Sequence, residues 1–290
     1  MRTFCVRGRS LPEGYHKAIF SLAMTKEKEC TMLINVKEPF AEPMISKLGI
    51  YTPKDLEQYR QEVCDGILDF EVERGNWDYT YHQRLAKWKE EVLRDLKRDA
   101  FSRRAVIAVR DNAKDFASGD PACLQSLQYM IRDGKLHCWA NMRSNDAVQA
   151  SFMNMFGFVM LQKEFADKLG LSVGEYTHYA TNYHAEPKRH ELLMSYAKKI
   201  HREMVKNHRN RIAERLGEPC EKPEALAYNY VGCWDEMMKD ARPEIAAQVE
   251  EQYGKYLAEK RCCANCGRDC KAIYDLNAHA LCCYDFLPKG

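Results

Sequence analysis

A cysteine that follows a proline-containing loop, at the start of an alternating segment, most constrains what this chain can fold into. Residues 120–125 read DPACLQ, and beyond Cys123 apolar residues recur at strand-like spacing as far as Ile131. Such alternation is typical of a half-buried strand. A structural cysteine is expected deeper within a strand, so Cys123 is placed like a nucleophile.

Composition indicates an ordinary globular chain. The 290 residues are 46% hydrophobic and carry a formal net charge of +2. The apolar content suffices for one large or two modest domains, and the charge is too small for a broad polyanion-binding surface. Binding to nucleic acid is therefore not expected, and any phosphate recognition must be local.

The number of cysteines, thirteen, has to be weighed against the cellular compartment. Met1 is not followed by an apolar signal segment, and no apolar run is long enough to span a membrane. These features predict a cytoplasmic protein with reduced thiols and no membrane contact.

Hydrophobic periodicity and turn residues predict the order of helices and strands. A basic loop with two arginines next to Gly8 is expected to precede the first helix. Helices are predicted over about 12–23, 53–70, 81–97, 147–169, 190–216 and 224–260, and strands over about 31–37, 105–109, 124–131 and 175–184.

Six of the thirteen cysteines lie between residues 262 and 283. Four-coordinate zinc takes thiolate or imidazole ligands, and a short segment with little hydrophobic core needs a bound metal ion to stabilise its fold. We predict a structural zinc site in a small ribbon-like appendage, with Cys263 and Cys266 as two ligands. The other two come from Cys270, His279, Cys282 and Cys283, with the pair Cys282 and Cys283 preferred. The alternative is a set of reduced surface thiols.

Six blocks in a fixed order carry a resemblance to a known family. They are Arg103-Arg104, PACLQ at 121–125, RSND at 143–146, Asn154, GEY at 174–176 and His184. Together they resemble the thymidylate synthase and pyrimidine nucleotide hydroxymethylase superfamily. The segments VRGRSLPEG, KEPFAEP, YTYHQRL and CLQ are most similar to the shorter archaeal-type synthases, and the resemblance covers about residues 3–190.

The resemblance implies an α+β fold, in which a layered, twisted sheet packs with helices. It also implies a homodimer whose sheets pack face to face, with arginines shared across the interface. We expect a catalytic domain over residues 1–215, a helical extension over 216–257 and the Cys-rich segment over 258–290.

The resemblance further implies a covalent mechanism. Cys123 would add as a thiolate to C6 of a uracil-type ring, and C5 would then capture the methylene of 5,10-methylenetetrahydrofolate. Nearby guanidinium groups favour the thiolate. A glutamate in the helix before Gly66 would organise the proton transfers; Glu57 and Glu62 are both candidates, and Glu62 is preferred.

The family pattern also implies which side chains bind the substrates. A carboxamide at Asn154 suits O4 and N3–H of uracil, whereas an aspartate there suits cytosine. The phosphate of a pyrimidine nucleoside monophosphate would be bound by Arg7 (Arg9 being the alternative), Arg103, Arg104, Arg143 and Ser144. His184 and Tyr81 would contact the base and sugar, and Asp146 and Trp77 the folate.

Several activities are compatible with this pattern. We expect a C5 one-carbon transferase that favours dUMP, with formation of 5-hydroxymethyl-dUMP narrowly preferred. The preference arises because Glu186 replaces the family's sugar-binding tyrosine and because the Cys-rich end does not resemble the closing tail of the synthases. The alternatives are a thymidylate synthase that makes dTMP and dihydrofolate, a CMP or dCMP hydroxymethylase, and a non-catalytic nucleotide or nucleic-acid binding protein.

Overall fold

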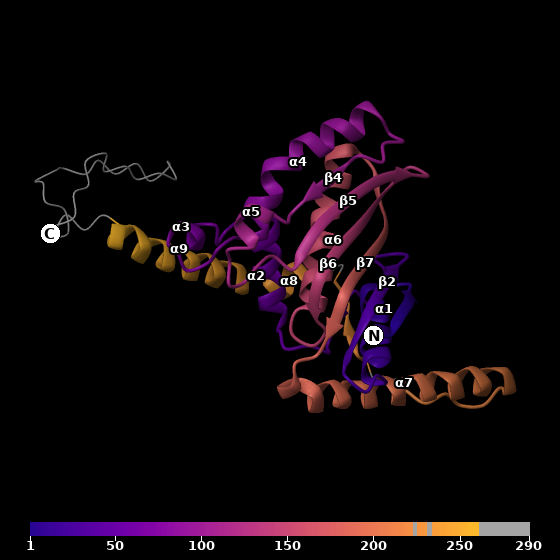
Figure 1. The fold of residues 1–290 in the computed structure, drawn as a ribbon. Helices are drawn as coiled ribbons and strands as arrows, with labels where there is room; N and C mark the ends of the chain where they lie inside the picture. Colours follow the sequence, from indigo (N-terminus) through magenta and orange to yellow (C-terminus); the bar gives the residue numbers. More distant parts are fainter. Residues whose placement is uncertain (223–224, 231–233, 261–290) are drawn as a thin grey trace, which may run out of the picture.

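A computed structural model describes residues 1–222, 225–230 and 234–260 (Figure 1). The strands are β1 (Thr3–Gly8), β2 (Glu29–Val36), β3 (Ile45–Ser46), β4 (Val106–Ala108), β5 (Leu124–Arg132), β6 (Lys135–Asp146), β7 (Ser172–His184) and β8 (Ala227–Tyr228). The helices are α1 (Leu11–Ala23), α2 (Pro53–Cys64), α3 (Phe70–Glu73), α4 (Tyr81–Arg98), α5 (Asn112–Asp115), α6 (Ser151–Leu169), the 3-10 turn η1 (Pro187–Arg189), α7 (His190–Leu216), α8 (Trp234–Met238) and α9 (Ala241–Lys260).

The centre of the fold is a mixed sheet of six strands in the order β1-β2-β7-β6-β5-β4. The pairs β1/β2 and β6/β7 are parallel, and the remaining neighbours are antiparallel. Register shifts interrupt the β2/β7, β5/β6 and β6/β7 pairs. The chain therefore has the α+β architecture that was predicted, with Cys123 immediately before β5.

Helices α1, α6 and α4 cover one face of the sheet (Figure 1). Strand β2 shows why, because Cys30, Met32, Ile34 and Val36 alternate with less buried residues and form part of the core. Gly14 of α1 approaches this row so closely that an added Cβ would lie 3.0 Å from Ile34. The helices thus seal a single apolar layer against the sheet.

The opposite face of the sheet carries apolar side chains that remain only partly buried. Leu33 pairs with Tyr179 across β2 and β7, and Trp139 pairs with Gln128 across β6 and β5. All four side chains have intermediate exposure. Paired residues share a face, so these positions lie together on the side away from α1 and α6.

The helix predicted over 53–70 is shorter in the structure. Thr52 caps its start, accepting from the backbone N–H of Asp55 at 3.3 Å while the Asp55 carboxylate accepts from the Thr52 N–H at 2.7 Å. The helix ends at Cys64 because Gly66 adopts a left-handed φ of +71°. A Cβ at Gly66 would lie 2.1 Å from the His82 ring, so glycine is required there.

The predicted basic loop near the N-terminus is also different, since residues 3–8 form strand β1 at the sheet edge. Phe4 and Val6 pack against the core, which explains the strand. The strand predicted over 105–109 is the edge strand β4, in which Ile107 is buried and Val106 is 45% exposed.

The region expected to be one helix over 224–260 contains β8, α8 and α9 in its described part. Strand β8 pairs with β3. Trp234 is 2% exposed and its ring lies 5.5 Å from that of Phe156 in α6. A second apolar cluster joins Phe70 of α3 to Tyr256 of α9. Figure 1 shows α9 beside α2 and α3.

Among the described residues, none of the helices is both long and apolar enough to cross a lipid bilayer.

Candidate active site

The loop that carries Cys123 is fastened to β6 by Arg143. The Arg143 guanidinium donates to the carbonyl oxygens of Pro121 at 2.5 Å and Ala122 at 3.1 Å. The Arg143 backbone N–H donates to the carbonyl oxygen of Cys123 at 2.8 Å. Three hydrogen bonds from one residue fix the loop at the start of β5. The Cys123 side chain itself is partly exposed.

Burial raises the pKa of the Cys123 thiol above its ordinary value, and the Asp120 carboxylate raises it further. The Arg143 guanidinium acts in the opposite direction and stabilises the thiolate. In the absence of substrate the thiol is therefore protonated at neutral pH, with one cation placed to favour its ionisation.

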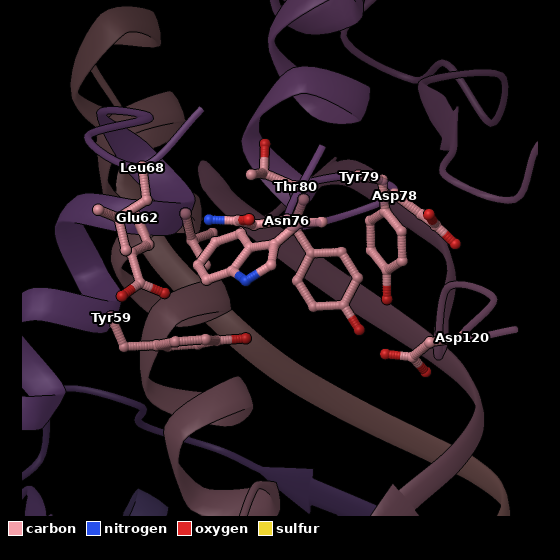
Figure 2. A pocket seen from close by; sticks show the side chains of 11 residues that line it. Tyr59, Glu62, Leu68, Asn76, Asp78, Tyr79, Thr80 and Asp120 are labelled. Carbon is pink, nitrogen blue, oxygen red and sulfur yellow. The ribbon is translucent and has the colours of Figure 1, made fainter. Parts of the chain in front are cut away.

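A cavity of about 360 Å³ lies between α2 and the segment that leads into α4 (Figure 2). We call it the first cavity. Its walls are formed by Tyr59, Glu62, Val63, Leu68, Asn76, Trp77, Asp78, Tyr79, Thr80, Tyr81 and Asp120. Figure 2 shows Tyr59 and Glu62 on one side, and Asp78, Tyr79 and Asp120 on the other. The volume is in the range of small-molecule sites.

The two candidate glutamates have different surroundings. Glu62 lines the first cavity, and burial raises its pKa although Gln58 donates a hydrogen bond to it at 3.0 Å. Glu57 is fully buried elsewhere, where it accepts hydrogen bonds from Arg60, Trp234 and Arg242. The placement of Glu62 agrees with the preference for it, and its role in proton transfer stays a prediction.

The structure adds Tyr59, which the sequence did not single out. Its hydroxyl donates a hydrogen bond to the side-chain oxygen of Asn154, the residue predicted to bind the base. The hydroxyl of Tyr81 accepts from the backbone N–H of Leu124 at 3.2 Å, next to Cys123. Burial raises the pKa of Tyr59 and Tyr81 well above the ordinary value, and the charge of Cys123 contributes to both shifts.

Tyr79 is supported from behind by a buried ion pair. Arg84 donates to both carboxylate oxygens of Asp115, at 2.6 and 2.7 Å, and to the carbonyl oxygen of Val109 at 3.0 Å. Its guanidinium lies 4.4 Å from the centre of the Tyr79 ring. This pair ties α4 to the loop that leads to Cys123.

Two of the predicted nucleotide-binding residues lie in another hollow, of about 420 Å³, which we call the second cavity. It is lined by Glu27, Lys28, Glu29, Ser144, Asn182, His184, Ala185, Glu186, Pro187 and His190. Among the described residues, the buried Oδ1 of Asn182 and Nδ1 of His184 have no hydrogen-bond partner. Nε2 of His184 lies 3.5 Å from the carboxylate of Glu186.

Arg7 and Arg9 are not brought to the second cavity. Arg7 lies opposite Asn35 of β2, which in turn pairs with Thr177, seven residues before His184 on β7. This corresponds to about 20 Å along the strand. The Arg9 guanidinium is paired with Glu38 at 3.0 Å.

The cation that the second cavity does contain is Lys28, in the loop between α1 and β2. Its backbone φ is +53°, and its ammonium donates to the carbonyl oxygens of Ala23 and Thr25. No motif marked Lys28, because a lone lysine in a charged turn has no distinctive pattern.

Arg103 and Arg104 are exposed and lie between α4 and β4. The Arg103 carbonyl accepts from the side chain of Gln128, and Arg104 pairs with Asp99 at 3.3 Å. Gln128 is five residues along β5 from Cys123, or roughly 16 Å. Within a single chain these arginines are therefore remote from the cysteine.

The two predicted folate contacts lie apart. Trp77 lines the first cavity and is 42% exposed. The Asp146 carboxylate accepts from the backbone N–H groups of Val148 and Gln149 and from Arg189 at 2.6 Å, and Asp146 does not line the first cavity. Both folate roles stay predictions.

The predicted zinc ligands Cys263, Cys266, Cys282 and Cys283 lie outside the described residues. Within residues 1–222, 225–230 and 234–260, no group of three or more His, Cys, Asp or Glu side chains is placed to hold a metal ion.

Comparisons with known proteins agree on one family. A sequence model described as "Thymidylate synthase" matches residues 52–217. A "Putative thymidylate synthase" of Methanocaldococcus jannaschii is 30% identical over 174 residues, which cover 55% of this chain and 75% of that protein. Its counterpart in Methanothermobacter thermautotrophicus is 30% identical over 157 residues, covering 52% and 65%.

A solved structure shares the fold. Thermostable thymidylate synthase A from Bacillus subtilis superposes with a TM-score of 0.54 at 16% identity, covering 65% of this chain and 84% of that one. The family match spans more than half of the chain, and the archaeal relatives confirm the predicted resemblance to archaeal-type proteins. The chain therefore belongs to the thymidylate synthase family of one-carbon transferase enzymes.

Proposed function

We propose that this protein transfers a one-carbon unit from 5,10-methylenetetrahydrofolate to C5 of a uracil nucleotide, with dUMP preferred and Cys123 as the nucleophile. The observation that carries the proposal is the position of Cys123. Cys123 lies at the start of β5, where it interacts electrostatically with the Arg143 guanidinium and with Tyr59, Tyr79 and Tyr81.

The described side chains can each perform a step on the base. The Cys123 thiolate, favoured by Arg143, adds to C6 and makes C5 nucleophilic. Asn154 binds O4 and N3–H of the ring. Glu62, whose pKa is raised by burial, is the carboxyl group of the first cavity that we assign to the proton transfers.

The first cavity fits a folate ring system. Trp77 and Tyr79 offer aromatic faces, and Asn76, Asp78 and Asp120 offer polar atoms. When bound there, the folate supplies the activated methylene that C5 attacks. Asp146 contributes to folate binding in this proposal only by ordering the turn before α6.

The second cavity supports binding of the sugar and phosphate. Ser144 can donate to a phosphate oxygen, and the unpartnered Asn182 and His184 atoms can pair with sugar hydroxyls. Lys28 supplies positive charge in this cavity, Arg143 precedes Ser144 on β6, and Arg103 and Arg104 come from a second subunit.

The sheet face opposite α1 and α6 supports a homodimer. Leu33, Trp139 and Tyr179 lie together there and are only partly buried. Packing two such faces together would bury them and would carry the exposed arginines toward the partner's cysteine.

We place the product as 5-hydroxymethyl-dUMP, with dTMP as the second candidate. The polar side chains of Asn76, Asp78 and Asp120 in the first cavity support this choice, because they can hold the water that hydroxymethylation needs, and the charge of Asp120 acts on Cys123. The decisive assay uses dUMP labelled with tritium at C5, followed by mass spectrometry of the nucleotide.

Tritium release with a hydroxymethyl mass gain and formation of tetrahydrofolate is the expected result. A methyl gain with dihydrofolate would make the protein a thymidylate synthase. If only dCMP or CMP releases tritium, the protein is a cytidylate hydroxymethylase, and if no nucleotide does, a binding protein without catalysis.

Two further predictions belong to the same proposal. The Cys-rich segment 258–290 forms a zinc-binding appendage on the helical extension 216–257, beside the catalytic domain 1–215. Elemental analysis of the purified full chain should find one zinc per chain, and it should be lost in a variant with serine at Cys263 and Cys266.

A further inference from the structure

We propose that Tyr59 determines the base preference of this enzyme by fixing the orientation of the Asn154 side-chain amide. Tyr59 is thus a positioning residue, which acts on the substrate through Asn154. The inference rests on the proposed function, since it assumes that Asn154 reads a pyrimidine ring.

The contact joins α2, which lines the first cavity, to α6, which packs against it. Tyr59 projects from α2 and its hydroxyl donates to Oδ1 of Asn154 on α6. Asn154 is 6% exposed, so little water competes for this bond. The structure describes no other hydrogen bond to the Asn154 side chain.

Gly157 of α6 makes room for the tyrosine ring. A Cβ at this position would lie 3.0 Å from Cε1 and 3.1 Å from Cδ1 of Tyr59. Gly157 is one helical turn after Asn154, on the same side of α6. The pair is therefore set by the packing of α2 on α6 and is not an incidental surface contact.

The surroundings keep the tyrosine in its donor form. Burial, followed by the charges of Glu62, Tyr79 and Cys123, holds the pKa of Tyr59 well above its ordinary value. A protonated phenol that donates to Oδ1 leaves the Nδ2 amino group directed away from Tyr59. The amide then presents a donor to O4 of uracil, and the remaining lone pair of Oδ1 can accept from N3–H.

Cytosine requires the opposite arrangement. Its 4-amino group needs an acceptor and its N3 needs a donor, so the amide would have to rotate and turn its N–H groups toward the Tyr59 hydroxyl. The hydroxyl hydrogen would then have to leave Oδ1. The hydroxyl oxygen would accept from that N–H, but the buried hydroxyl hydrogen would lose its own acceptor. Tyr59 favours uracil because of this lost donor bond, which is worth about one neutral hydrogen bond.

The test compares dUMP and dCMP in the wild-type protein and in Tyr59→Phe. The ratio of kcat/KM for the two nucleotides, measured by tritium release from C5, should fall about threefold to tenfold in the variant. Tyr79→Phe is the matched control, because Tyr79 lines the same cavity without contacting Asn154. Its ratio should equal that of the wild type.

A second background makes the test independent of general damage to the site. In Asn154→Asp the two carboxylate oxygens are equivalent, so there is no amide orientation to fix. Tyr59→Phe should leave the nucleotide ratio unchanged in that background. The proposal is overturned if Tyr59→Phe does not change the dUMP-to-dCMP ratio of kcat/KM when Asn154 is present. It is also overturned if Tyr59→Phe lowers this ratio equally with Asn154 and with Asp at that position.

Failure of the proposed function is distinguishable from failure of this inference. If the wild-type protein releases no tritium from either nucleotide, the ratio of the dUMP and dCMP dissociation constants, measured by calorimetry, replaces the kinetic ratio. The same fall in Tyr59→Phe is then expected, and its absence contradicts the role of Tyr59.

Discussion

The indole N–H of Trp234 donates to the buried carboxylate of Glu57 at 2.9 Å, so a residue from the C-terminal extension holds the helix that carries Tyr59 and Glu62. Arg60 and Arg242 complete the shell around this carboxylate. Burial raises the pKa of Glu57, but the hydrogen bonds from Arg60 and Trp234 outweigh it and the net shift is downward.

Substituting Glu57 by Gln should therefore destabilise the fold. The change removes the buried anion that Arg60 and Arg242 share, while Asp65 and Asp235 still pair with them, so the expected cost is that of lost charged hydrogen bonds, about 1.5–3 kcal/mol. Urea unfolding of both proteins at pH 7 measures it. Glu244→Gln is the control, because the Lys54–Glu244 pair also joins α2 to α9 but is exposed, and its loss should cost less than about 1 kcal/mol.

Replacing Cys123 by Ser should abolish turnover and leave nucleotide binding intact. The hydroxyl of serine is far less acidic than a thiol, so it does not add to C6, while the residues of the second cavity are unchanged. Tritium release and calorimetric titration with dUMP measure the two properties. Retained tritium release would remove Cys123 from the mechanism.

Neutralising Asp120 should make Cys123 more reactive. The Asp120 charge helps to raise the pKa of the thiol, so Asp120→Asn lowers that pKa and enlarges the thiolate fraction at pH 8. The rate at which iodoacetamide labels the Cys123 peptide, followed by mass spectrometry, should increase. Asp78→Asn alters the same cavity without this effect and should leave the rate unchanged.

The ion pair of Arg84 and Asp115 should contribute stability above about pH 4. The hydrogen bond from Arg84 holds the pKa of Asp115 at about 2. A carboxyl group whose pKa is lowered by folding stabilises the folded state at pH values above its unfolded-state pKa. This contribution is lost as the pH falls toward 2.

The measurement is urea unfolding of Asp115→Asn and the wild type as a function of pH. At pH 7 the variant should be less stable by about 3–5 kcal/mol, since Asp115 is buried, and the difference should shrink between about pH 4 and pH 2. Asp167→Asn, in the exposed Lys163–Asp167 pair, should show neither effect. A difference that is constant with pH would contradict the charge argument.

Mixing two inactive variants should restore activity if arginines are shared between subunits. Cys123→Ser retains Arg103 and Arg104, and a double alanine variant of these arginines retains Cys123. Random re-formation gives about half mixed dimers with one complete site each, so about a quarter of the wild-type activity is expected. No recovery, with mixed dimers present, would mean that each site uses its own arginines.

Local patterns predicted the central part of the fold. The alternation after Cys123 is β5, and the apolar period before Gly170 is α6, which ends where that glycine takes a φ of +68°. These elements are determined by short-range periodicity and by a stop signal, both visible in a single sequence.

The errors and omissions depend on contacts between distant residues. Glu57 and Glu62 lie on one helix with similar neighbours, and only Trp234, 177 positions away, shows which of them faces the extension. The sequence predicts a loop around Arg7 because the two apolar positions Phe4 and Val6 are too few to indicate a strand. Tyr59 has no motif, since its relation to Asn154 exists only once α2 packs on α6.

The packing of α8 and α9 has a consequence for how this protein can be shortened or recombined. The family match ends at residue 217, yet Trp234 packs in the core beside Phe156, and Tyr256 donates to Glu73, a few residues before Trp77 of the first cavity. We expect a chain cut at residue 217 to lose part of its own interior. The extension is therefore part of the folded unit, and a chimaera that exchanges the catalytic region between relatives would have to include it.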